Sequence, residues 1–155
     1  MSTIGYVAGD FITKSFRLTS IGGYAVKLQN QTGAASVKGT LVEASSGTDL
    51  AVNTITADAV DCIGVIYEDG VANGSDVWVV VGGVAEVLLE DGTAATRDYW
   101  VRTSETDAGR ADATNAAPPG GTVAAIEEHL AEIGHCLETV SSGTDVLCKI
   151  LMHFN

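Results

Sequence analysis

Short apolar runs separated by turn residues dominate the sequence between residues 63 and 103. The runs are Ile63–Tyr67, Val77–Val81, Val84–Leu89 and Tyr99–Arg102, and they are rich in the β-branched and aromatic residues that favour strands. The pairs that separate or follow them tolerate the positive φ of tight turns: Asp69-Gly70, Asn73-Gly74, Gly82-Gly83 and Asp91-Gly92. The pattern predicts a β-meander that turns at these pairs.

The run Val77–Val81 is apolar at every position. Because successive side chains of a strand point to opposite sides, this run is predicted to be covered on both faces. The following run carries Glu86 and Glu90, which give it one polar face.

Further strands are expected on both sides of this region. They are Tyr24–Leu28, Lys38–Ala44, His135–Val140 and Val146–Phe154, with a shorter candidate at Arg110–Thr114. The pentapeptide SSGTD occurs twice, at Ser45–Asp49 and Ser141–Asp145, each time with an apolar run before and after it. This repeat indicates a hairpin that is used twice within one sheet or barrel.

One helix is expected, at Thr122–Ile133, with Thr122 as N-cap and Gly134 at its end. The apolar residues at helical spacing are Val123, Ile126, Leu130 and Ile133. A helix of this length is marginal alone, so we expect that side to pack on the sheet.

The first 21 residues differ from the rest because their apolar residues are not accompanied by turn signals. We expect residues 1–21 to form an N-terminal arm, or an edge strand at Asp10–Leu18, and residues 22–155 to form a single β-rich domain. An excursion is expected at residues 116–133, which contain the chain-breaking Pro118-Pro119-Gly120-Gly121. The predicted fold class is mainly β: an antiparallel β-barrel or β-sandwich with one short helix and an N-terminal arm.

Composition narrows the possible functions. A chain of 155 residues with 46% apolar content can bury a core without staples, and no apolar run approaches the roughly 18 residues of a membrane span. The formal charge of −12 and the scattered cations argue against a nucleic-acid surface. We therefore expect no nucleic-acid or membrane partner, and no secretory signal is recognisable at the start.

The histidines and cysteines are the candidate metal ligands and nucleophiles of the chain. Cys136, Cys148, His135 and His153 are close enough in sequence to meet across the last hairpin, but they form no C-x-x-C or H-x-x-x-H pair. In a strand, His135 and Cys136 point to opposite faces, so no metal site is expected there. His129, with Glu132 nearby, is expected on a solvated polar face. No nucleophile motif and no phosphate loop occurs, so we expect no enzyme, metal or cofactor. The three cysteines, Cys62, Cys136 and Cys148, are expected to be reduced, buried thiols.

The order of strands and turns resembles that of the head decoration, or capsid cement, proteins of tailed bacteriophages. The residues that carry the resemblance are Tyr24–Leu28, Ile63–Ile66, Gly74–Val77, Gly83–Val87, Gly92–Ala94, Asp98–Val101, Ile133–Glu138 and Gly143-Thr144, within about residues 22 to 154. The resemblance implies a homotrimer that is bound to the major capsid protein on the outer capsid surface, and that is located in the host cytoplasm during assembly. It implies no catalysis and supplies no binding residues.

Aromatic residues are the natural candidates for capsid or subunit contact: Tyr6, Phe11, Phe16 and Trp78. Two alternatives remain open. The first is another virion component, such as a tail tube or a fibre attachment. The second is a β-rich carbohydrate-binding module in which Trp78 and Trp100 form an exposed stacking platform.

Overall fold

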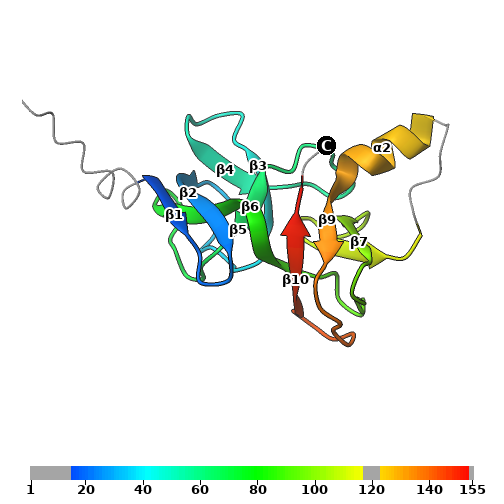
Figure 1. The fold of residues 1–155 in the computed structure, drawn as a ribbon. Coiled ribbons are helices and arrows are strands. Elements are labelled where there is room, and N and C mark those ends of the chain that lie inside the picture. Colours follow the sequence, from blue (N-terminus) through cyan, green and yellow to red (C-terminus); the bar gives the residue numbers. More distant parts are fainter. Residues whose placement is uncertain (1–14, 117–122, 154–155) are drawn as a thin grey trace, which may run out of the picture.

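A computed structural model describes residues 15–116 and 123–153, and this part of the chain is built almost entirely of strands (Figure 1). The strands are β1 (Phe16–Leu18), β2 (Gly23–Asn30), β3 (Leu41–Ala44), β4 (Ala51–Thr54), β5 (Gly64–Ile66), β6 (Asp76–Leu88), β7 (Trp100–Thr103), β8 (Ala111–Thr114), β9 (Glu132–Cys136) and β10 (Leu147–Met152). The helix is α2 (Val123–Ala131), and it lies at the opposite end of the molecule from β1 (Figure 1). The mainly-β class is confirmed, since all these strands belong to one hydrogen-bonded sheet.

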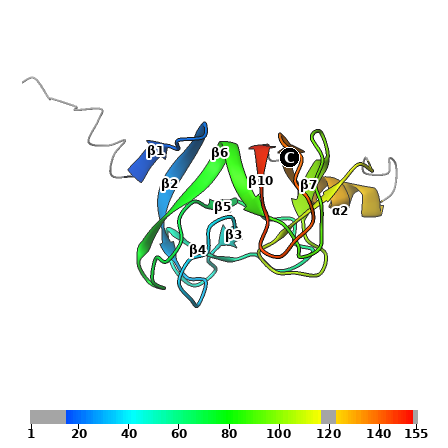
Figure 2. The ribbon, with the colours of Figure 1, turned by 90° about the horizontal axis from the view of Figure 1, so that it is seen from below.

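Five strands of the first half form a closed circuit of pairs. β2 pairs with β4, β4 with β3, β3 with β5, β5 with β6, and β6 returns to β2. Figure 2 shows these strands gathered on one side of the molecule. One compact hydrophobic cluster takes a side chain from each of them: Leu28, Val42, Val52, Ile66, Val77 and Val79. This cluster holds the circuit together from one common side.

The pairing of β2 with β4 is parallel, so the prediction of a wholly antiparallel sheet is wrong at this pair. The reason is topological. The chain leaves β2, turns back through the β3–β4 hairpin, and β4 returns alongside β2 in the same direction to close the circuit.

β6 is a single strand of 13 residues, although the sequence predicted two strands with a turn at Gly82-Gly83. Its first half pairs with β2 and β5, and its second half with β10. Gly83 has a φ of +74°, and the register against β2 shifts between Tyr24 and Ala25. The two glycines therefore bend the strand without reversing it, because a positive φ serves a bulge as well as a turn.

The second half of the chain extends the sheet from the far part of β6, in the order β10, β9, β7, β8. Leu89, just after β6, forms a bridge with Ala111 at the start of β8, so this half also returns to β6. The predicted meander is wrong beyond β6, because β6 pairs with β10 and not with β7. In this half Ala85, Val87 and Ile150 lie in the larger core cluster.

Both SSGTD segments join antiparallel neighbours, the first linking β3 to β4 and the second β9 to β10. The predicted reuse of one hairpin is confirmed. The strand expected from His135 begins earlier, at Glu132, and Gly134 lies inside it with a φ of +154°. The helix consequently ends at Ala131 and continues directly into β9.

The helix is present, but its expected packing is wrong. Val123, Ile126 and Leu130 are 74%, 60% and 45% exposed, whereas Ile133 is buried within β9. Because α2 ends before Ile133, the apolar side is one residue shorter than expected. The helix meets the sheet at β7, where His129 packs edge-on against Trp100. No helix in the described part of the chain is long and apolar enough to cross a membrane.

Candidate functional site

Of the four residues predicted to make contacts, two can be placed. Tyr6 and Phe11 lie outside the described residues. Phe16 begins β1 and is partly exposed, with its ring 6.1 Å from that of Tyr24. Trp78 is only 8% exposed and belongs to the core of its own chain. The guanidinium of Arg17 lies 5.2 Å from the centre of its ring, as in a cation–π contact.

The predicted covering of both faces at Val77–Val81 is confirmed within a single chain. Val77 and Val79 pack in one hydrophobic cluster, while Trp78 and Val80 pack in the other. No second subunit is needed to account for the apolar character of this strand.

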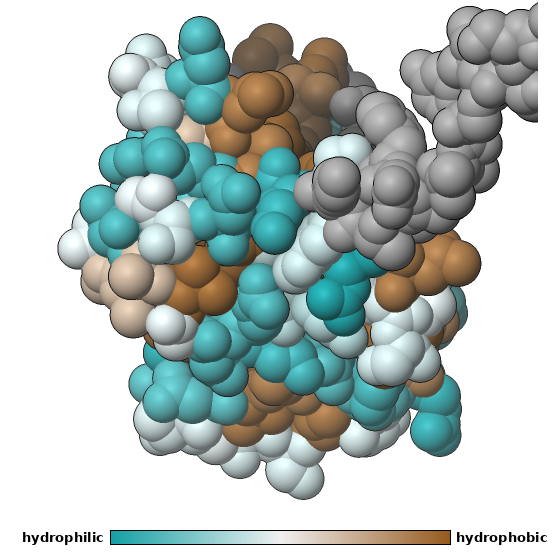
Figure 3. All heavy atoms as spheres, turned by 90° about the vertical axis from the view of Figure 1, so that its left-hand side faces the viewer, coloured by the Kyte–Doolittle hydropathy of each residue, from teal (hydrophilic) through white to brown (hydrophobic). Residues whose placement is uncertain are grey.

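The β1–β2 edge hairpin presents apolar side chains at one end of the sheet. β1 lies at the end of the strand order, and in the part of the chain that the structure describes it pairs with β2 alone. Leu18 is 72% exposed and stands opposite Tyr24, which is 44% exposed. We call Phe16, Leu18 and Tyr24 the edge patch. On the side of the molecule seen in Figure 3, apolar patches are separated by hydrophilic side chains. An open edge with apolar neighbours is suited to strand addition by a partner.

A second accessible row crosses the outer face of the other half. Val84, Leu151, His135 and Trp100 are successive Cα partners on β6, β10, β9 and β7. Leu151 is about half exposed, and the other three are partly exposed. Trp100 stands at the end of the row with its ring 4.5 Å from that of His135. Trp78 and Trp100 therefore do not form one exposed platform, since the former is in the core and the latter packs against histidine.

All three histidines of the chain converge on one buried carboxylate, at the junction of α2, β9 and the residue after β10. Glu132 is 3% exposed. Its Oε1 lies 2.9 Å from His153 Nε2 and 3.5 Å from His135 Nε2, and its Oε2 lies 3.5 Å from His129 Nδ1. We call Glu132, His135 and His153 the histidine–glutamate cluster.

From the sequence, His135 and His153 are grouped with two cysteines as candidate metal ligands, and Glu132 is not included. Cys136 and Cys148 are buried in the core, on the side of the sheet away from His135, so the predicted separation of His135 from Cys136 is confirmed. All three thiols are free, but Cys62 is partly exposed rather than buried. Burial of its sulfur raises the pKa of Cys62 to about 12, which makes it a poor nucleophile. The signal that could have found the glutamate is the spacing of three from His129 to Glu132 to His135.

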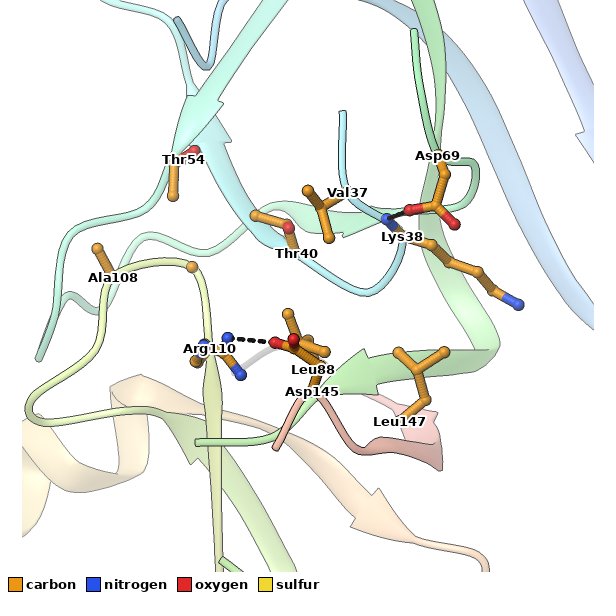
Figure 4. Close-up of a pocket in the computed structure, with 11 residues that line it drawn as sticks. Val37, Lys38, Thr40, Thr54, Asp69, Leu88, Ala108, Arg110, Asp145 and Leu147 are labelled. Carbon is orange, nitrogen blue, oxygen red and sulfur yellow. Dashed lines mark hydrogen bonds and ion pairs between the residues drawn. The ribbon is translucent and has the colours of Figure 1, made fainter. Parts of the chain in front are cut away.

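A cleft of about 540 Å³ lies where the two halves meet (Figure 4). Its ionisable side chains are Lys38, Asp69, Arg110 and Asp145. Arg110 donates hydrogen bonds to Asp145 at 2.6 Å and to the carbonyl of Leu89 at 2.8 Å, and Lys38 pairs with Glu86. Each cation that lines the cleft thus has a carboxylate partner. The residues that line it include no histidine or cysteine.

No protein-family model and no curated protein matches the sequence. Among solved structures, the chain is similar to the N base of the head fibre protein gp8.5 of bacteriophage phi29, at 14% sequence identity. The match covers 83% of this chain and 92% of that chain, with a TM-score of 0.54. At this identity the likeness shows a shared fold, and its coverage means that it concerns most of the strand arrangement and not one hairpin.

Proposed function

We propose that this protein is a structural component of a tailed-phage virion that binds the outside of the head and cements neighbouring capsomers. The observation that carries the proposal is the fold shared with a head-fibre base over 92% of that chain. The strand and turn order that resembles capsid cement proteins supports the same role.

The physical character of the molecule fits a brace better than a catalyst. Both halves of the sheet return to β6, so a load applied to one half reaches the other through a continuous backbone and its hydrogen bonds. In the described residues, the cations that line the cleft between the halves, Lys38 and Arg110, are each paired with a carboxylate. We therefore propose that the protein transforms no substrate.

We assign attachment to the major capsid protein to the N-terminal segment together with the edge patch. An extended partner strand can hydrogen-bond to the open side of β1 while Leu18 and Tyr24 supply apolar contact. The expected result is that Leu18→Ser weakens co-sedimentation with capsids that lack the protein. Leu50→Ser is the matched control, because Leu50 is 81% exposed but lies in the β3–β4 turn. Equal binding by the two variants would remove the edge patch from the proposal.

We assign self-association into a homotrimer to the exposed apolar side of α2. Val123, Ile126 and Leu130 are accessible in the single chain, and a nine-residue helix gains little stability alone. A second copy is the chosen occupant because a homotrimer buries one patch of each subunit without requiring another protein. Light scattering should give a trimer for the unmodified protein and a smaller species for Ile126→Glu, whereas Val37→Glu, at another exposed position, should remain trimeric. A monomer of the unmodified protein at micromolar concentration would refute this assignment.

A second candidate is a base on which a head fibre stands, and the similarity to the N base of a phage head fibre favours it. The two roles differ in what they do to the shell. Particles with and without the protein should be compared by heating until DNA is released, and by cryo-electron microscopy. A cement raises the release temperature and places its density at the joints between capsomers. A fibre base leaves the release temperature unchanged, and absence of the protein from the head exterior would contradict both roles.

A further inference from the structure

We infer that the histidine–glutamate cluster is a binding site for a divalent transition metal of the zinc class. The inference concerns the isolated subunit and does not depend on the proposed function.

The first support is the geometry of the three ligand atoms. Glu132 Oε1, His135 Nε2 and His153 Nε2 lie within 4.8 Å of one another, and the carboxylate oxygen is 3.5 and 2.9 Å from the two nitrogens. Zinc binds imidazole nitrogen and carboxylate oxygen at about 2.0–2.2 Å, so two ligands of a tetrahedral ion stand roughly 3.3–3.5 Å apart. Small side-chain movements would bring all three atoms to that spacing.

The second support is an unsatisfied buried group. Glu132 Oε1 is shielded from solvent and makes no hydrogen bond of acceptable geometry within the described residues, although two imidazole nitrogens lie near it. A buried carboxylate oxygen without a donor is costly. A metal ion that accepts this oxygen and both Nε2 atoms removes the cost, and two histidines with one carboxylate are a ligand set that zinc uses.

The third support is the way in which the backbone assembles the cluster. Glu132 begins β9 directly after α2, and Gly134 lets the chain run close to β10, where His135 lies opposite Leu151. An ideal Cβ on Gly134 would stand 2.2 Å from the carbonyl oxygen of Leu151. His153 follows β10, so a bound ion would tie the junction of α2 and β9 to the residue after β10. His129 Nδ1 lies 3.5 Å from the other oxygen of Glu132, so a third imidazole adjoins the cluster.

The test uses the full chain without a histidine tag, titrated with Zn²⁺ by calorimetry. We expect one ion per chain with a dissociation constant near or below about 10 μM, and a higher melting temperature in excess Zn²⁺. His135→Ala and His153→Ala should each weaken binding at least about 100-fold, because even the loss of an outer-shell partner costs 10–100-fold. Cys62→Ala is the control and should bind normally.

Two further readouts keep the test decisive if a variant folds poorly. In the unmodified protein, Zn²⁺ should shift the ring-nitrogen NMR signals of His135 and His153. Co²⁺ should quench the fluorescence of Trp100, whose ring is 4.5 Å from that of His135, and Trp100→Phe should remove this quenching. Failure to bind at 100 μM Zn²⁺, unchanged affinity in both histidine variants, or loss of binding in Cys62→Ala would overturn the inference.

Discussion

Replacing Gly83 with alanine tests whether the fold requires a glycine where β6 bends and passes close to the start of β2. Gly83 has a φ of +74°, a conformation that costs an L-residue about 1–2 kcal/mol. A Cβ there would also stand 2.6 Å from the carbonyl oxygen of Gly22 and 3.1 Å from the Cα of Gly23. Both are backbone atoms of the partner segment, so β2 and β6 must separate, at a cost comparable with the roughly 1–3 kcal/mol of overpacking a core.

The matched control is Gly74→Ala. Gly74 has a φ of +84°, but a Cβ there would meet no atom within 4 Å. It therefore carries the conformational penalty alone, about 1–2 kcal/mol. Both replacements restrict the unfolded chain equally, so this contribution cancels in the comparison.

The expected loss is about 2–5 kcal/mol for Gly83→Ala, against about 1–2 kcal/mol for Gly74→Ala. For a domain of this size, 1 kcal/mol corresponds to about 2–4 °C in melting temperature, so the two variants should fall by roughly 4–20 °C and 2–8 °C. Urea unfolding monitored by tryptophan fluorescence should show unchanged m-values. If Gly83→Ala is no less stable than Gly74→Ala, the close approach of β2 and β6 is not a constraint and the reasoning is refuted.

Three other predictions concern separate features. Arg110→Met removes a hydrogen bond to the carbonyl of Leu89 and two ion pairs with exposed aspartates. It should lower the free energy of unfolding by about 2–3 kcal/mol, and most of this loss should come from the hydrogen bond to the carbonyl. A loss below about 0.5 kcal/mol in urea unfolding would contradict this. Burial raises the pKa of Cys62 to about 12, so at pH 8 it should react with iodoacetamide about a hundredfold more slowly than a free thiol. Because the unfolded state loses this proton first, the free energy of unfolding should fall as the pH rises from about 8.5 towards 12. Rapid alkylation of the folded chain would refute both statements. At a concentration low enough for the unmodified protein to be monomeric, Ile126→Glu should change the melting temperature by less than about 2 °C, since the Ile126 side chain is 60% exposed. A larger drop at that concentration would place Ile126 in the core.

Local patterns in the sequence predicted most strands, because alternation and turn residues act over a few positions. The apolar run Val77–Val81 correctly indicated a strand covered on both faces, and the SSGTD repeat correctly indicated two hairpins. Gly82-Gly83 was misread because the same positive φ suits a turn and a bulge. Only the partners of the strand decide between them, and these partners, β2 and β10, come from distant parts of the chain.

The histidine–glutamate cluster shows the same limit at the level of a site. Strand alternation rightly separated His135 from Cys136. It could not bring in Glu132, because that residue was expected within a helix and not at the start of a strand. His153 joins them only through the antiparallel pairing of β9 with β10. The sequence shows that a glutamate and two histidines are present, but whether their side chains come together depends on where α2 ends.

The two halves of the molecule are joined by more than β6, and this bears on a bracing role. The N–H of Leu88 donates to the carbonyl of Gly39 at 2.9 Å, and the N–H of Leu41 donates to the carbonyl of Gly109 at 2.8 Å. The N–H of Gly109 in turn donates to Ile55 at 2.9 Å. A hinge at Gly82-Gly83 would have to break these bonds together, so bending between the halves is opposed by several groups at once. The edge patch and α2, which lie at opposite ends, are therefore held at a fixed separation, so the surface proposed for capsid attachment keeps a set distance from the surface proposed for self-association.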